Sequence, residues 1–153
     1  LGVCGGGGVL RDSSGGLLFA YSAFLGESTS LCVEARIVLL GVDLCIERGF
    51  DRFFVQSDSS VLIGILQRPF RCLWNIRRTV KRIWHLVAEG SWFLYCYRES
   101  NKVVDVLANV RVAHHLESIR TYDTLDALLT MARREIRICE SWSLPFYVHK
   151  IMG

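Results

Sequence analysis

The chain has 153 residues, of which 51% are hydrophobic and 22% charged, and its formal net charge is +3. These values predict one globular domain with an appended tail, and the mild positive charge permits contact with nucleic acid without requiring it. No apolar run is long enough to cross a bilayer, and no basic segment followed by an apolar block argues for secretion. We therefore expect an intracellular protein, with nucleus or cytoplasm left open.

The first element is predicted from a glycine-rich stretch, GGGGVLRDSSGG, at residues 5–16. A P-loop needs a Lys-Ser/Thr pair after its glycines, and a dinucleotide fingerprint needs a strand before them; neither is present. Residues 12–14 favour a turn, and Gly15 or Gly16 can supply the positive φ that such a turn requires. We therefore predict a β-hairpin whose second strand covers Leu17–Phe24.

A long helix is predicted for ESTSLCVEARIVLLGVDLCIERGF, residues 27–50. One of the three hydroxyl residues at positions 28–30 caps its start, and Gly49 ends it. Apolar residues recur at helical spacing through Val33, Ile37, Leu40 and Leu44. A short buried strand at 52–56 follows, and then a brief helix, VLIGIL, which Ser59 or Ser60 can cap.

The stretch Trp74–Glu89 is amphipathic, with two faces at helical spacing. Its apolar face holds Ile76, Val80, Ile83 and Val87, and its basic face holds Arg78, Lys81, Arg82 and His85. A basic face of this kind is typical either of a phosphate-binding surface or of an ordinary solvated helix, and the sequence leaves both open. The tryptophans at 74, 84 and 92 are expected to pack in the core rather than to stack on bases.

An apolar strand at 92–97 and a final helix at 101–113 complete the pattern. The order strand, strand, helix, strand, helix, helix, strand, helix predicts a mixed α/β fold. We assign residues 1–115 to this domain and residues 116–153 to a C-terminal extension that holds one late strand, near 137–139 or 146–148.

The six cysteines carry no metal-binding spacing. Neither Cys-x-x-Cys nor paired Cys/His spacing occurs among positions 4, 32, 45, 72, 96 and 139, which excludes zinc-ribbon and zinc-finger sites. Three of them lie in apolar periodic segments, where a free thiol behaves as a small hydrophobic group. We therefore predict that all six are reduced and structural.

Three acidic residues lie in otherwise apolar surroundings. Glu34 opens the long helix, Asp58 ends the strand at 52–56, and Asp105 lies in the final helix. Each alone is typical of a solvated carboxylate at an element boundary. Carboxylates at strand ends and facing helix turns can also converge to hold a divalent metal through hard oxygen ligands.

Four blocks in order carry a resemblance to a known family. They are GGGGVLRDSSG, TSLCVEARIVLLGVDLCIERGF, VQSDSSVLI and YRESNKVVDVLANV, and they span about residues 4 to 113. The chain resembles the ribonuclease H type 1 family, in the branch found in plant retroelement-derived proteins. The resemblance implies an α/β fold with a mixed sheet flanked by helices.

The resemblance also implies a function. The family cuts the RNA strand of RNA–DNA hybrids with Mg²⁺ or Mn²⁺ held by carboxylates, one ion activating water and the other stabilising the leaving oxygen. Glu34, Asp58 and Asp105 match three of the family's four metal-binding acids, and Arg78, Lys81, Arg82 and His85 lie where some relatives have a basic region that contacts the hybrid.

The family's fourth acid lies on a central first strand that precedes the glycine-rich loop. That strand has no counterpart in this sequence, so we expect an incomplete two-metal site that lacks one of its four acids. We also expect a sheet without its central strand, or a late segment that takes its place. Two functional classes therefore stay open. One is a metal-dependent endonuclease acting on RNA–DNA hybrids, and the other is a catalytically inactive nucleic-acid-binding or interaction remnant.

Overall fold

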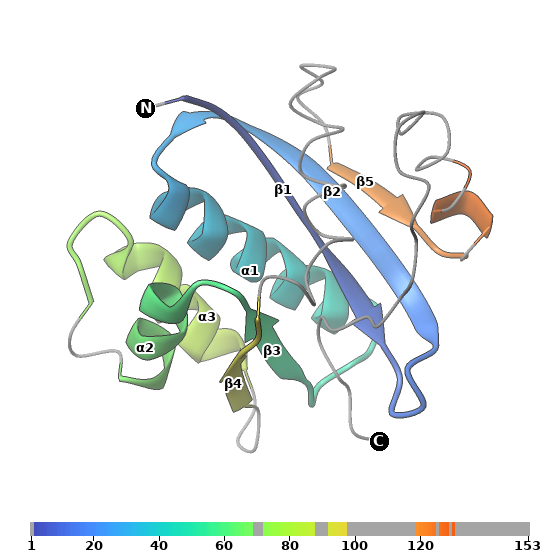
Figure 1. Cartoon of the computed structure of the whole chain (residues 1–153). Helices are drawn as coiled ribbons and strands as arrows, with labels where there is room; N and C mark the ends of the chain where they lie inside the picture. The colour runs from blue at the N-terminus through green and yellow to red at the C-terminus, as the bar shows by residue number, and fades with distance from the viewer. Residues whose placement is uncertain are drawn as a thin grey trace.

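The computed structural model describes residues 2–68, 72–87, 92–97, 119–124, 126–128 and 130. Their elements are shown in Figure 1: β1 (Gly2–Arg11), β2 (Leu17–Ser28), α1 (Ser30–Glu47), β3 (Phe54–Ser57), α2 (Ser60–Gln67), α3 (Arg77–Leu86), β4 (Trp92–Tyr95) and β5 (Ile119–Tyr122). The predicted order is confirmed from the hairpin through β4. The final helix predicted at 101–113 lies outside the described residues.

The predicted hairpin is confirmed, and its turn is built by one carboxylate. Asp12 accepts backbone N–H bonds from Ser14 at 2.9 Å and from Gly16 at 2.8 Å, and Gly15 adopts a φ of 87°. The hydrogen bond from the Ser14 side chain, followed by those from the backbone, lowers the pKa of Asp12. The turn residues therefore form the local side-chain hydrogen bonds that the sequence predicts.

The glycines of β1 allow the long helix to approach the hairpin closely. A Cβ atom on Gly6 would lie 2.2 Å from Cγ1 of Ile37, and one on Gly8 would lie 2.4 Å from the ring of Tyr21. On the helix side, a Cβ on Gly41 would lie 2.2 Å from the Tyr21 hydroxyl. The glycine run is thus a packing surface beneath α1 rather than a ligand-binding loop.

Helix α1 ends as its sequence predicts. The N–H of Gly49 donates to the carbonyl of Ile46, and the N–H of Phe50 donates to the carbonyl of Cys45, each at a distance of 2.9 Å. Gly49 has a φ of 84°. This pair of bonds with a left-handed glycine is the Schellman arrangement, which satisfies carbonyls that the helix end would leave exposed.

The described strands form two sheets. One has the order β1-β2-β5, and the other pairs β3 with β4 in parallel. None of the described strands pairs with both β1 and β3. The two late segments suggested for the central position, 137–139 and 146–148, fall outside the described residues.

Strand β5 was not expected from the sequence. It pairs antiparallel with residues 20–23 of β2 and so extends the hairpin sheet at its outer edge. An ion pair between Arg48 and Asp123 adds a second link between the end of α1 and this region. The strand lies within the stretch assigned to a C-terminal extension, and the boundary at residue 115 stays a prediction.

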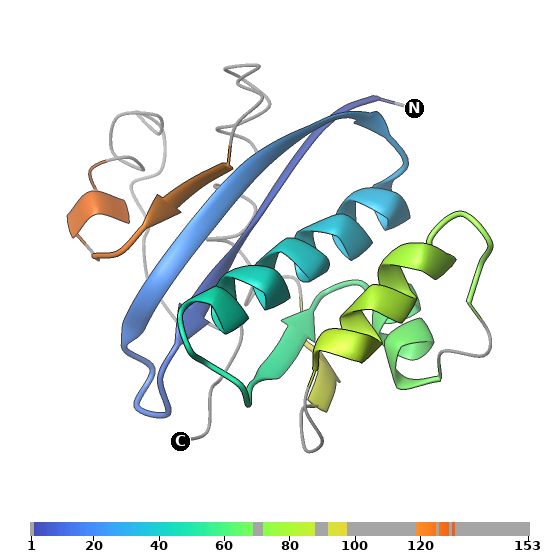
Figure 2. The same ribbon diagram turned by 180° about the vertical axis from the view of Figure 1, so that it is seen from behind.

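One hydrophobic core joins the two sheets. Helix α1 lies across the face of β1 and β2, with α3 beside it (Figure 2). The fully buried side chains come from every layer, and the largest are Tyr21, Phe19, Leu10, Leu62, Leu66, Ile76 and Ile83. None of the described helices is both long and apolar enough to cross a membrane.

Candidate nucleic-acid site

Asp58 lies at the carboxyl edge of the β3–β4 sheet. It directly follows Ser57, the last residue of β3, whose carbonyl accepts a hydrogen bond of 2.9 Å from the N–H of Cys96. The next residue, Ser59, caps α2 by accepting the N–H of Leu62 at 3.3 Å. Asp58, which is partly buried, therefore lies between a strand end and a helix start whose backbones are both hydrogen-bonded.

The negative charge of Asp58 acts on Cys96. Burial, and after it the charge of Asp58, raises the pKa of the Cys96 thiol to about 11. Both residues follow the ends of parallel strands, whose carboxyl ends meet at one edge. Cys96 is 8% exposed and stays a neutral thiol at this edge near neutral pH.

Glu34 lies in the second turn of α1, where its side chain is partly buried. Its Oε1 accepts a hydrogen bond of 3.2 Å from the Ser30 hydroxyl. Asp105 lies outside the described residues. Within the part of the chain that the structure describes, no group of three or more His, Cys, Asp or Glu side chains could hold a metal ion.

The predicted basic face is present on α3. Arg78, Lys81, Arg82 and His85 are all exposed, whereas Val80 and Ile83 on the other face are buried. Arg82 lies 3.6 Å from Asp43 of α1, so part of its charge is balanced within the chain. Arg77 is also exposed and lies one turn before Lys81; this spacing in the sequence signals that it belongs to the same face.

The expectation that the tryptophans pack in the core is wrong. Trp74 is 85% exposed, Trp92 is 59% exposed and Trp84 is 39% exposed. Trp74 lies in the turn before α3, outside the helix whose apolar face is buried. Trp92 belongs to a strand of which only one face packs on the helices.

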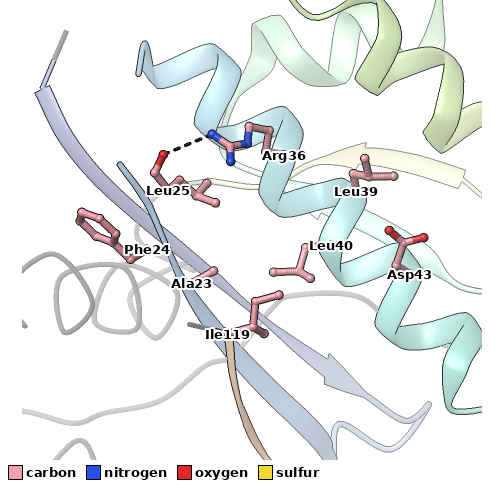
Figure 3. Close-up of a pocket in the computed structure, with 8 residues that line it drawn as sticks. All are labelled: Ala23, Phe24, Leu25, Arg36, Leu39, Leu40, Asp43 and Ile119. Atoms are coloured by element: carbon pink, nitrogen blue, oxygen red, sulfur yellow. Dashed lines mark hydrogen bonds between the residues drawn. The ribbon is translucent and has the colours of Figure 1, made fainter. Parts of the chain in front are cut away.

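A cavity of about 340 Å³ lies between β2, α1 and the start of β5. Figure 3 shows the residues that line it: aliphatic side chains, Phe24, and the charged groups of Arg36 and Asp43. The Arg36 guanidinium donates a hydrogen bond of 3.2 Å to the carbonyl of Leu25. None of the predicted site residues lines this cavity, but its lining residue Asp43 pairs with Arg82 of the basic face.

Comparison with known families decides what this arrangement is. Residues 2–111 match the model of the reverse transcriptase-like family, which is ribonuclease H-like. The chain belongs to this ribonuclease H-like family. The match covers all four sequence blocks that suggested the resemblance, and it includes both Glu34 and Asp58.

The ribonuclease H-like domain is also similar to one curated plant protein. That relative is an Arabidopsis thaliana protein named "Putative ribonuclease H protein", which is 27% identical over 138 residues. The aligned part is 88% of this chain but only 22% of the relative. The chain therefore spans about a fifth of that protein's length.

Solved structures share the fold. RNase H1 from the archaeon Halobacterium salinarum superposes with a TM-score of 0.67 at 21% identity, over 76% of this chain and 92% of that one. LC11-RNase H1, solved in complex with an RNA/DNA hybrid, gives 0.69 at 21% identity, over 75% and 91%. The N-terminal RNase H domain of a Mycobacterium tuberculosis protein gives 0.63 at 17% identity, over 89% and 91%. The ribonuclease H-like fold class is thereby confirmed.

Proposed function

We propose that this domain binds RNA–DNA hybrids and hydrolyses their RNA strand with the help of a divalent metal. The observation that carries the proposal is the position of Asp58 at the carboxyl edge of β3, within a chain that belongs to the ribonuclease H-like family. A similar structure, LC11-RNase H1, was solved with an RNA/DNA hybrid bound.

Glu34, Asp58 and Asp105 would hold the metal. All three are carboxylates, and such hard oxygen ligands suit Mg²⁺ or Mn²⁺. When bound, the metal supplies an activated water and stabilises the charge of the leaving oxygen. The chain's own contribution is to hold the carboxylates in place, which Ser30 does for Glu34 and the β3–α2 junction does for Asp58.

The basic face of α3 would hold the phosphate backbone. Arg78, Lys81 and His85 are exposed along one side of the helix and can contact successive phosphates. Contacts of this kind are independent of sequence and provide affinity and register rather than base specificity. Arg82 would contribute less, because Asp43 already lies 3.6 Å away.

The test is cleavage of an end-labelled RNA–DNA hybrid by the 153-residue chain with Mg²⁺ and with Mn²⁺. Asp58→Asn and Glu34→Gln should each reduce cleavage by about a hundredfold or more, because a lost metal ligand removes several kcal/mol of transition-state stabilisation. Glu47→Gln, at the exposed end of the same helix as Glu34, is the matched control and should cleave like the original chain.

Two results would contradict the proposal in different ways. Cleavage that survives both substitutions would show that neither Glu34 nor Asp58 takes part in the reaction. Tight hybrid binding by a folded chain without any cleavage would instead favour the non-catalytic class, a nucleic-acid-binding domain that keeps the fold.

A further inference from the structure

Aromatic side chains form a row along one side of β4 and the residues that follow it. Phe93 packs against Trp84 of α3, with ring centroids 5.5 Å apart and planes tilted by 50°. Tyr95 and Tyr97 meet edge to face, with centroids 5.6 Å apart and planes at 75°. Because alternate residues of a strand share a face, Phe93 and Tyr95 point to the same side. We name Trp84, Phe93, Tyr95 and Tyr97 the aromatic row.

The row becomes more exposed along the chain. Phe93 is 6% exposed, Tyr95 is 49% exposed and Tyr97 is 72% exposed. The ring of Phe93 therefore belongs to the core, whereas Tyr95 presents about half and Tyr97 most of its surface to water. An edge-to-face pair leaves ring faces open, and an open aromatic face can stack on another flat group.

The row connects the two parts of the proposed site. At one end, Trp84 belongs to α3, the helix that also carries the exposed basic residues Arg82 and His85. At the other end, Tyr95 lies opposite Ser57 in the parallel register, directly before the position of Asp58. The row thus runs from α3, which carries the cations, through the buried Phe93 to the strand end that Asp58 follows.

We propose that the aromatic row stacks on unpaired nucleobases, so that this domain prefers hybrids with a single-stranded extension over blunt hybrids. The inference rests on the proposed hybrid binding and specifies the form of substrate. Bases within a duplex already stack on their neighbours, whereas unpaired bases can stack on aromatic side chains regardless of sequence. The cations of α3 complement the phosphates of the same strand.

The experiment measures hybrid binding by fluorescence anisotropy without divalent metal, so that no cleavage occurs. A blunt hybrid is compared with the same hybrid carrying a single-stranded extension of about four nucleotides, a short site size for one binding groove. The extension should tighten binding about fivefold or more, the gain from one stacked base. Tyr97→Ala should abolish most of that gain, and Tyr97→Phe, which keeps the ring, should retain it.

Trp92→Ala is the matched control. Trp92 lies on the same strand with 59% exposure, but its alternate position puts it on the opposite face. Its truncation should leave the gain unchanged. Each variant is checked by its circular dichroism, and the comparison of the two hybrids on the original chain needs no variant at all.

The outcomes separate the two proposals. Equal binding of both hybrids by the original chain overturns the stacking inference but leaves hybrid binding intact. Binding of neither hybrid contradicts the proposed function itself. A dimer in sedimentation that Tyr97→Ala dissociates would show that the row is a protein interface, and this also overturns the stacking inference.

Discussion

The hydroxyl of Tyr21 on β2 donates a hydrogen bond of 3.0 Å to the carbonyl oxygen of Ile37 on α1. The Tyr21 ring fills a space that exists only because Gly8 and Gly41 have no side chains. Burial raises the pKa of the Tyr21 hydroxyl far above its usual range, so the group remains a donor at neutral pH. One side chain thus joins the hairpin to the long helix.

Tyr21→Phe should therefore lower the free energy of unfolding by about 0.5–1.5 kcal/mol, the usual net value of one hydrogen bond. The ring stays and only the bond to Ile37 is lost. Urea unfolding followed by circular dichroism measures the change. Tyr97→Phe removes a hydroxyl from a residue that is 72% exposed and should change stability by less than about 0.5 kcal/mol. Equal effects at both positions would contradict a structural role for the bond.

Gly8→Ala should destabilise the domain by about 1–3 kcal/mol, because its Cβ would lie 2.4 Å from the Tyr21 ring in a filled core. Gly64→Ala is the opposite case. Gly64 lies inside α2, where a Cβ would meet nothing within 4 Å, so alanine should stabilise the helix by up to about 1 kcal/mol. Denaturation midpoints of both variants provide the test, and shifts of the same sign would refute the packing argument.

Stability should fall at alkaline pH through Cys45. Burial raises the pKa of this thiol from 9.0 to about 12 in the folded chain. The folded state therefore keeps a proton that the unfolded state loses, and the free energy of unfolding falls as pH rises from about 9 toward 12. Unfolding midpoints at about pH 8 and about pH 10 should show the loss. Cys45→Ala should make the decline shallower, and an unchanged decline would exclude this thiol as its source.

Hybrid affinity should depend on salt through α3. Arg78→Ala and Lys81→Ala should each reduce the slope of log affinity against log salt by about 0.9, the value for one phosphate contact. Arg82→Ala should reduce it less, because Asp43 lies 3.6 Å from the guanidinium. Anisotropy titrations over a range of KCl concentrations measure the slopes. Arg52→Ala, an exposed cation before β3, is the control. Unchanged slopes for all three would identify the face as merely solvated.

Local signals predicted much of this fold. The Asp12 turn and the glycine end of α1 rest on hydrogen bonds between residues close in sequence, so their residue types predict them directly. Strand β5 could not be found in this way. Three of its four side chains are exposed, with only Tyr122 buried, so it lacks the alternation that marks a half-buried strand.

The sequence predicted the strand that precedes the candidate site residue Asp58. It did not predict which other residues lie near Asp58. The strand pattern predicts that Asp58 follows a strand end, and the structure has it there. The approach of Cys96 to Asp58 depends on the register of two parallel strands that are distant in sequence. The exposure of the tryptophans likewise depends on which faces the helices cover, and composition does not reveal this.

Helix α1 is the element on which the two sheets depend jointly. It packs on β1 and β2 and also contacts α2 and α3, whereas the described strands of the two sheets share no ladder. Native-state exchange of amides in both sheets should therefore reveal the opening of α1. Opening of α1 would release the amides of β3 as well as those of the hairpin, so the slowest-exchanging amides of both sheets should share one opening free energy. The long helix thus makes two small sheets a single cooperative unit.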